Sequence, residues 1–256
     1  MAAEGRVRSQ RVWGFVLIAA LLVLWEVSAR TWVSSNNWPP ISRIVVAGAQ
    51  ALAAGELPQV FGSSLWRMLA GYAAGAGLGV LVGVLMGRFR LVNAALDTLV
   101  ELVRPIPIPA IVPPLILLLG IDATMKIFIV AFASFFPVLV NTIAGVRSVD
   151  RVSLDVARTF HVSPARTLWR VVLPASMPFI MVGLRTSLAL ALIVTVIAEM
   201  IAGSEGIGYY LMTMQYAMRS GEMYAAILLL ALMGYLLNLC MLGVERRVLH
   251  WFQRGS

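Results

Sequence analysis

The chain has 256 residues, of which 60% are hydrophobic and 12% charged, and its mean hydropathy is +0.88. Soluble domains carry about 25% charged residues, so this composition excludes a chain folded in water and indicates a lipid bilayer. Lys and Arg number 20 against 12 Asp and Glu. Because the arginines separate apolar stretches and form no basic face, they indicate orientation in a membrane and not a nucleic-acid partner.

Six apolar segments have the length of a membrane span, which is about 20 residues. They are 12–29, 64–87, 94–120, 123–145, 177–201 and 223–244. No strand pattern competes with them, and lipid admits only helices or closed barrels, so we predict an all-α polytopic membrane protein. Segment 12–29 follows several arginines and lacks a small-residue cleavage site, which favours an uncleaved span over a signal peptide.

The distribution of positive charge predicts the topology. With a cytoplasmic N-terminus, 13 of the 20 basic residues fall on the cytoplasmic side, 5 fall outside and 2 lie within spans. The five on the outside are Arg30, Arg43, Arg67, Lys126 and Arg219. This bias predicts that both termini are cytoplasmic. The predicted organisation is a cytoplasmic segment 1–11, a first span with an outer amphipathic segment over 12–63, a core of five spans over 64–244 and a cytoplasmic tail 245–256.

The second span carries glycines at every fourth residue. Residues four apart form one ridge on a helix, and a glycine ridge lets another helix approach closely in lipid. The residues predicted to pack in this way are Gly71, Gly75, Gly79, Gly83 and Gly87.

The third span is interrupted by prolines, each of which removes a backbone hydrogen bond from a helix. Such a break either lines or gates a transport pathway or is a structural kink. Arg185 and Glu199 are 14 residues apart, close to four helical turns, and are expected to share a face; snorkelling to the interface is the alternative for the arginines. The candidate pathway or gate residues are Arg104, Pro105, Pro107, Pro109, Asn141, Arg185, Glu199 and Met200.

Several kinds of chemistry lack a motif. No phosphate-binding loop of the form G-x-x-x-x-G-K-[ST] is present, and the only lysine, Lys126, follows a methionine. The two histidines lie in separate segments without acidic or cysteine neighbours, so we expect no metal site and no catalytic residues. Glu199 and the other carboxylates of the spans fall near span ends, which disfavours an ion-coupled secondary transporter or channel, and nothing favours an intramembrane enzyme.

The basic segment 145–176 between the fourth and fifth spans is expected to be cytoplasmic. Ser163 followed by Pro164 is a helix-start signal. We therefore predict one short helix ending near Phe160 and a second from Pro164 to Leu173, with Pro174 marking the turn into the fifth span.

This segment resembles the EAA loop of permeases of binding-protein-dependent ABC importers. Asp155, Val156 and Ala157 stand at the Glu-Ala-Ala positions, His161 at the loop glycine, and Leu173-Pro174 at the end of the pattern. Histidine tolerates a positive φ better than most residues, so it can replace the glycine. The resemblance assigns ATPase coupling to Asp155, Val156, Ala157, Arg158, Thr159, Phe160, His161, Val162, Ser163, Pro164, Leu173 and Pro174.

Further motifs resemble the sulfonate, taurine and nitrate branch of this family. They include Arg104–Pro107, Leu119–Ile121, Phe135–Pro137, Ala198–Met200 and Gly206–Gly208. The resemblance implies a type I importer permease fold in a prokaryotic inner membrane and a second permease subunit, by default identical. It also implies a cytoplasmic ATPase dimer that binds ATP and Mg, an extracytoplasmic binding protein, and a small anionic solute such as a sulfonate, taurine, nitrate, bicarbonate or related carboxylate.

The resemblance also suggests roles within the loop. Ala157 is small enough for close docking on the ATPase, Phe160 offers an apolar anchor, and Arg158 and Arg166 offer charges at the rim. The alternative is an ordinary basic loop held near anionic lipid. For the Met- and Tyr-rich outer segment 202–222, an outer gate or binding-protein contact and plain subunit packing are equally open.

Overall fold

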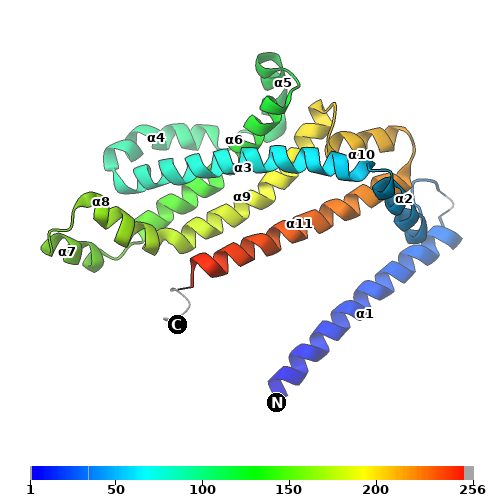
Figure 1. The fold of residues 1–256 in the computed structure, drawn as a ribbon, viewed down its shortest axis with the longest axis horizontal. Coiled ribbons are helices and arrows are strands. Elements are labelled where there is room, and N and C mark those ends of the chain that lie inside the picture. Colours follow the sequence, from blue (N-terminus) through cyan, green and yellow to red (C-terminus); the bar gives the residue numbers. More distant parts are fainter. Residues whose placement is uncertain (1, 34, 251–256) are drawn as a thin grey trace. The chain divides into compact units, whose positions relative to one another are not determined.

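The computed structural model describes residues 2–33 and 35–250, and every regular element in that part of the chain is a helix (Figure 1). The all-α prediction is confirmed. Met1 of the predicted N-terminal segment and residues 251–256 of the predicted tail lie outside the described residues. The elements are α1 (Ala2–Thr31), α2 (Ile41–Ala53), α3 (Glu56–Arg88), α4 (Arg90–Val103), α5 (Ile108–Leu119), α6 (Ala123–Arg147), α7 (Arg151–Thr159), α8 (Pro164–Thr167), the π-helical η1 (Leu168–Val172), α9 (Leu173–Ala202), α10 (Ile207–Tyr216) and α11 (Ser220–Val248).

Four helical segments in the described part of the chain are long and apolar enough to cross a membrane. They are Glu56–Arg88, Ala123–Arg147, Pro164–Ala202 and Ser220–Val248, and they coincide with the second, fourth, fifth and sixth predicted spans. Segment 12–29 lies within α1. The third predicted span is α4 and α5, which bend by 98° at their junction and make a fifth crossing if counted as one. A count of six spans stays a prediction.

The chain divides into two compact units, Met1–Gln59 with Tyr210–Leu230, and Val60–Tyr209 with Ala231–Ser256. In the first unit, the end of α1 is fixed to the turn before α2 by aromatic packing. Trp25 stacks on Trp38 with ring centroids 4.5 Å apart, and Tyr224 meets Trp25 edge-on at 5.7 Å. The outer helix predicted from sequence is α2, and its buried face consists of Ile44, Gly48 and Ala51.

In the second unit, the five ridge glycines of α3 all meet α6. A Cβ atom added at Gly71 would lie 2.6 Å from the Ile127 carbonyl oxygen, and one at Gly87 would lie 2.7 Å from the Val146 Cβ. Contacts at Gly75, Gly79 and Gly83 follow the same order along α6. The two helices are therefore parallel, and both end on the same side of the membrane.

Helices α6 and α9 pack on each other through a glycine on each side. A Cβ at Gly145 of α6 would lie 2.8 Å from Phe179, and one at Gly183 of α9 would lie 2.9 Å from Asn141. These pairs run in opposite order along the two helices, so α6 and α9 are antiparallel. The main core lies between them and includes Met125, Ile129, Val130, Ala191 and Val194.

The fifth predicted span begins earlier than expected. We predicted a turn near Pro174, but the helix is continuous from Pro164 to Ala202. A π-helical turn precedes the proline, and in it the Leu173 amide donates to the Leu168 carbonyl, five residues back. The wider π-turn accommodates a ring that would clash in a regular α-helix, so Pro174 does not end this helix.

Candidate functional site

The loop between α6 and α9 holds a short, well-capped helix, α7. At its start, the Asp150 carboxylate accepts a hydrogen bond of 3.2 Å from the Val152 amide. At its end, the Val162 amide donates to the Ala157 carbonyl and the His161 amide to the Arg158 carbonyl, each at 2.9 Å. This pair of bonds is a Schellman motif, and it requires a left-handed residue at position 161.

His161 has a φ of 50° and so takes the left-handed conformation expected of the glycine it replaces. After it, α8 begins at Pro164 as predicted, although the Ser163 side chain makes no capping hydrogen bond. Leu173 and Pro174 are half-buried within the continuous helix. The loop is therefore a compact helix–turn–helix whose second helix runs directly into α9.

One face of α7 presents apolar side chains to the outside. Val152, Val156 and Phe160 lie four residues apart, and Phe160 is 77% exposed. Three exposed apolar residues in one stripe are typical of a surface that docks on a partner. We call Val152, Val156 and Phe160 the α7 stripe.

Ala157 lies on the buried face of α7, away from the stripe, and its docking role on the ATPase stays a prediction. Its side chain is 6% exposed, because it faces the chain's own interior and not the outside. The sequence pattern could not separate the two faces of so short a helix. Arg158 points outward and pairs with Asp155 at 2.8 Å, while the Thr159 hydroxyl donates to the Asp155 carbonyl at 3.0 Å.

A cavity of about 430 Å³ lies where the α4–α5 junction faces α6 and α9. It brings together two of the predicted pathway residues, Arg104 and Asn141, and adds Thr186 of α9. The other lining side chains are mostly apolar: Ile106, Ile108, Phe132, Ala133, Phe136, Pro137, Val140, Leu190 and Val194.

The polar groups of this cavity are available to a ligand. Within the described residues, Arg104 has no ion pair or hydrogen-bond partner for its guanidinium. Asn141 donates from Nδ2 to the Pro137 carbonyl at 2.8 Å, which leaves its Oδ1 and its second amide hydrogen unused. The cavity is therefore a mostly apolar hollow with one unneutralised cation and one amide, which suits a small anion.

The predicted prolines shape the junction and do not line the cavity. Pro107 is the N-terminal cap of α5 and Pro109 lies in its first turn, while Pro105 is exposed in the turn after α4. Since proline lacks an amide hydrogen, these positions end α4 and restart the chain in a new direction. That change of direction brings Arg104 to the cavity.

Arg185 and Glu199, which were expected to share a face of one helix, lie in different surroundings with different partners. Arg185 lies 3.7 Å from Glu245 of α11 and lines a separate, largely apolar cavity of about 300 Å³. Glu199 is fully buried at the other end of α9, whereas Met200 is exposed. Fourteen residues bring two side chains to similar angles on a helix, but they stay about 21 Å apart along its axis.

Glu199 is the centre of a buried polar cluster. Its carboxylate accepts hydrogen bonds from the Ser64 hydroxyl at 2.8 and 2.9 Å and from the Gly208 amide at 3.1 Å. Arg67, which is 1% exposed, pairs with it at 3.1 Å and also with Glu205. The Ile207 amide donates to Ser64 Oγ at 2.8 Å. The cluster thus fastens the 203–208 turn to α3.

Sequence reasoning missed most of this cluster. Ser64, Arg67 and Lys126 are each about 1% exposed, although Arg67 and Lys126 counted as outer charges in the topology prediction. Lys126 Nζ donates to the Glu205 carbonyl at 3.5 Å. The available signal was a serine and an arginine three residues apart inside an apolar helix, a pattern that favours buried polar contacts over an exposed end.

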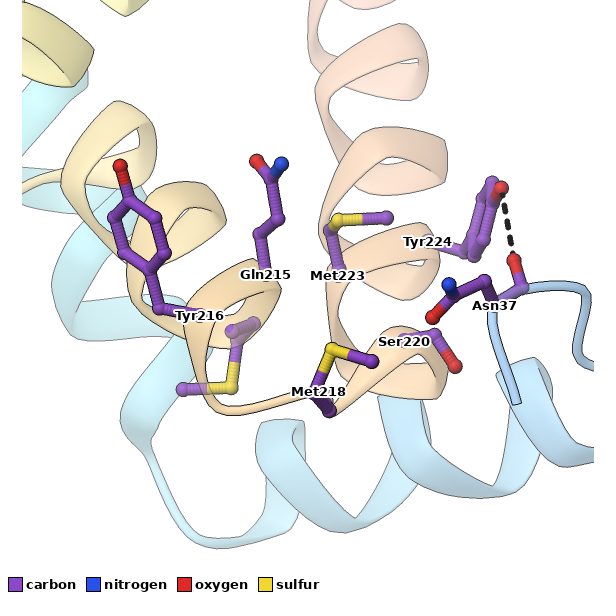
Figure 2. Close-up of a pocket in the computed structure, with 8 residues that line it drawn as sticks. Asn37, Gln215, Tyr216, Met218, Ser220, Met223 and Tyr224 are labelled. Atoms are coloured by element: carbon purple, nitrogen blue, oxygen red, sulfur yellow. Dashed lines mark hydrogen bonds between the residues drawn. The ribbon is translucent and has the colours of Figure 1, made fainter. Parts of the chain in front are cut away.

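The outer segment of the first unit contains a cavity of about 590 Å³, shown in Figure 2. Its side chains are polar or sulfur-containing: Asn37, Met214, Gln215, Tyr216, Met218, Ser220, Met223 and Tyr224. The Tyr224 hydroxyl donates to the Asn37 carbonyl at 3.4 Å. The outer gate or binding-protein contact and the subunit packing both stay predictions for this segment.

Comparison with known proteins identifies the family. Residues 75–252 match the model of the binding-protein-dependent transport system inner membrane component. The chain belongs to this family. It is therefore the membrane-spanning permease of an ABC importer, and the ion-coupled alternative is not favoured.

Relatives of this permease carry names from one branch of the family. An aliphatic sulfonates transport permease, SsuC of Bacillus subtilis, is 33% identical over 96% of this chain and 90% of its own length. The taurine transport permease TauC of Escherichia coli is 32% identical over 92% of this chain and 87% of its own. The bicarbonate transport permease CmpB of Synechococcus elongatus is 31% identical over 75% and 66%.

Solved ABC importers share the fold of the permease. The MetNI methionine transporter in an inward-facing conformation has a TM-score of 0.65 at 16% identity, covering 73% of this chain and 93% of that one. An amino acid ABC transporter has a TM-score of 0.61 at 15% identity, covering 81% and 97%. These likenesses support the type I permease fold.

Proposed function

We propose that this permease imports a small anion, of the sulfonate or carboxylate class, which an extracytoplasmic binding protein delivers. The relatives named for aliphatic sulfonates, taurine and bicarbonate support this class, since each of these solutes carries an acidic oxygen group. The unneutralised Arg104 beside Asn141 in the α4–α5 cavity is the observation that carries the proposal.

The chemistry of the cavity fits weak, transient binding of such an anion. A guanidinium offers two parallel N–H donors to a sulfonate or carboxylate, and the mostly apolar lining offers few other polar groups that could pair with the guanidinium. A single cation without further charge keeps the affinity modest. Modest affinity suits a pathway, because a transported solute must also leave.

The α7 stripe is the proposed contact with the ATPase. Its exposed Val156 and Phe160 would enter a cleft of the partner, which binds ATP and Mg, while this chain binds no nucleotide. Arg158 and Arg166 would lie at the rim. Closure of the ATPase dimer would then move α7, and with it the helix that begins at Pro164.

A second copy of this chain completes the proposed pathway, with both termini on the cytoplasmic side of a prokaryotic inner membrane. The excess of arginine at the ends of α3, α6 and α11 and around α7 supports this orientation. The relatives that match are single permease chains of similar length, so an identical second chain is the simplest partner.

Coupling is tested by making the stripe acidic. We expect Phe160→Asp to abolish capture of the ATPase and ATP-dependent uptake in proteoliposomes, since a charge would then be buried in an apolar contact. Phe89→Asp is the matched control, because Phe89 is 51% exposed in the turn after α3, on the same side of the membrane. Unchanged capture with Phe160→Asp would overturn the docking assignment.

The substrate class is tested with the cognate binding protein and ATPase in proteoliposomes. We expect uptake of sulfonates, taurine or bicarbonate, and we expect Arg104→Gln to lower the rate about tenfold through loss of a charge-assisted contact. ATP hydrolysis should persist in this variant. Full uptake by Arg104→Gln, or uptake of neutral solutes alone, would refute an anion pathway through this cavity.

A further inference from the structure

A second basic site lies at the base of the α7 loop. A groove of about 340 Å³ is formed where α3 and α6 end and where α7 and α8 begin. Four of its lining residues are arginines: Arg88, Arg147, Arg151 and Arg158. The remaining lining residues are small or apolar, namely Gly87, Val146, Val149, Leu154, Val162, Pro164, Thr167 and Val172.

The arginines of this groove are poorly neutralised. Arg158 pairs with Asp155, and Arg147 donates to the Asn93 side chain at 2.6 Å, which removes no charge. In the part of the chain that the structure describes, neither Arg88 nor Arg151 lies within ion-pair distance of a carboxylate. The groove therefore keeps a net positive charge of about three, on arginine side chains that are exposed and accessible to an anion.

The position of the groove identifies the chemistry that fills it. Gly87 and Val146 are in contact, so the parallel spans α3 and α6 end together beside it. A groove at the ends of two spans lies at the depth of lipid headgroups, where phosphate groups are concentrated. Its apolar wall of Val146, Val149 and Val172 also suits the glycerol and first methylene groups of a lipid.

We propose that this groove binds a phosphate group, held by Arg88 and Arg151 with support from Arg147. Arginine binds phosphate oxygens with two parallel hydrogen bonds, and arginines from α3, α6 and α7 surround one volume. The ligand fixes the start of α7 to the ends of α3 and α6. Its source is either the phosphodiester of an anionic lipid or a free phosphate anion.

The test uses the purified full-length chain in detergent, with native mass spectrometry to count bound phosphatidylglycerol and equilibrium dialysis to measure bound inorganic phosphate. We expect Arg88→Gln combined with Arg151→Gln to weaken binding about tenfold or more. The matched control is Arg246→Gln with Arg247→Gln, which removes two exposed arginines at the end of α11. Arg88→Lys with Arg151→Lys keeps the charge and should retain part of the binding.

The outcomes separate the sources and the alternatives. If the groove variant loses phosphatidylglycerol and keeps inorganic phosphate, while the α11 control keeps both, the ligand is a lipid headgroup. If the groove variant loses only inorganic phosphate, the ligand is a free anion. Equal losses in the groove variant and the α11 control would overturn the proposal, because bulk charge would then explain binding. Normal phosphate and lipid binding with failed ATPase capture would also overturn it, since the groove would then be a protein contact.

Discussion

Removal of the Glu199 carboxylate tests the buried cluster most directly. Glu199→Ala deprives the buried Arg67 of its buried counter-ion and leaves Ser64 Oγ and the Gly208 amide without their acceptor. Breaking a buried ion pair by removing one partner costs about 3–5 kcal/mol. Arg67 keeps Glu205, so we expect the lower end, about 3 kcal/mol of unfolding free energy.

The second carboxylate that pairs with Arg67 provides the control substitution. Glu205 also pairs with Arg67, but its side chain is 61% exposed, and exposed pairs contribute about 1 kcal/mol or less. We therefore expect Glu205→Ala to cost much less than Glu199→Ala. Arg67→Met combined with Glu199→Leu removes both members of the buried ion pair and should cost less than Glu199→Ala alone, because Arg67 is no longer left without its buried counter-ion.

The assay is denaturant unfolding of the purified permease in detergent micelles, followed by tryptophan fluorescence. Hydrogen exchange should show the 203–208 turn opening first in Glu199→Ala. A loss of less than about 1 kcal/mol in Glu199→Ala would refute the reasoning, as would a double variant that costs as much as Glu199→Ala alone.

Three further substitutions have local effects that can be measured. Gly75→Ala should destabilise the chain by about 1–3 kcal/mol, because its Cβ would overlap the backbone of α6; Gly77→Ala, which meets open space on the same helix, should be neutral or stabilising in the same unfolding assay. His161→Gly should slow hydrogen exchange at the end of α7 about twofold to fivefold, since it relieves a left-handed side chain at about 0.5–1 kcal/mol. Gly206→Ala should lower the thermal midpoint more than Gly55→Ala, because both have positive φ but only Gly206 abuts the buried carboxylate; equal shifts would contradict that contact.

Local patterns in the sequence were sufficient to predict several structural features. A glycine at every fourth residue predicts a packing ridge because the period of the helix fixes which side chains align. The left-handed turn at His161 was predicted because His161 stands at the glycine position of the EAA loop. The start of α8 was predicted from Ser163 followed by Pro164. Each of these depends on residues within one or two helical turns of each other.

Features that depend on distant residues could not be predicted in this way. Arg67 and Glu199 are 132 residues apart, and each alone resembles a charge at the end of a span. The burial of Ala157 depends on how α7 rests on its neighbours. The continuity of the helix through Pro174 depends on a π-turn, for which the sequence gives no reliable signal.

A single helical rod links the proposed site of coupling to the proposed pathway. It runs without a break from Pro164, directly after the α7 turn, to Ala202, which at 1.5 Å per residue is about 58 Å. On its way it contributes Thr186, Leu190 and Val194 to the Arg104 cavity.

The far end of this rod carries Glu199, which is fixed to α3 through Ser64 and Arg67. If both ends were free, a displacement of α7 would move the rod as a body and leave the cavity unchanged in shape. With one end held by buried charges, the same displacement must tilt the rod or deform it. The π-turn at Leu168–Val172 is less regular than the α-helix on either side, so bending would be concentrated there, between α7 and the cavity. Tilting of the helix would move Thr186, Leu190 and Val194, which line the cavity. If α7 couples to an ATPase as proposed, the buried cluster would hold the far end of this helix, and a movement at α7 would change the shape of the Arg104 cavity.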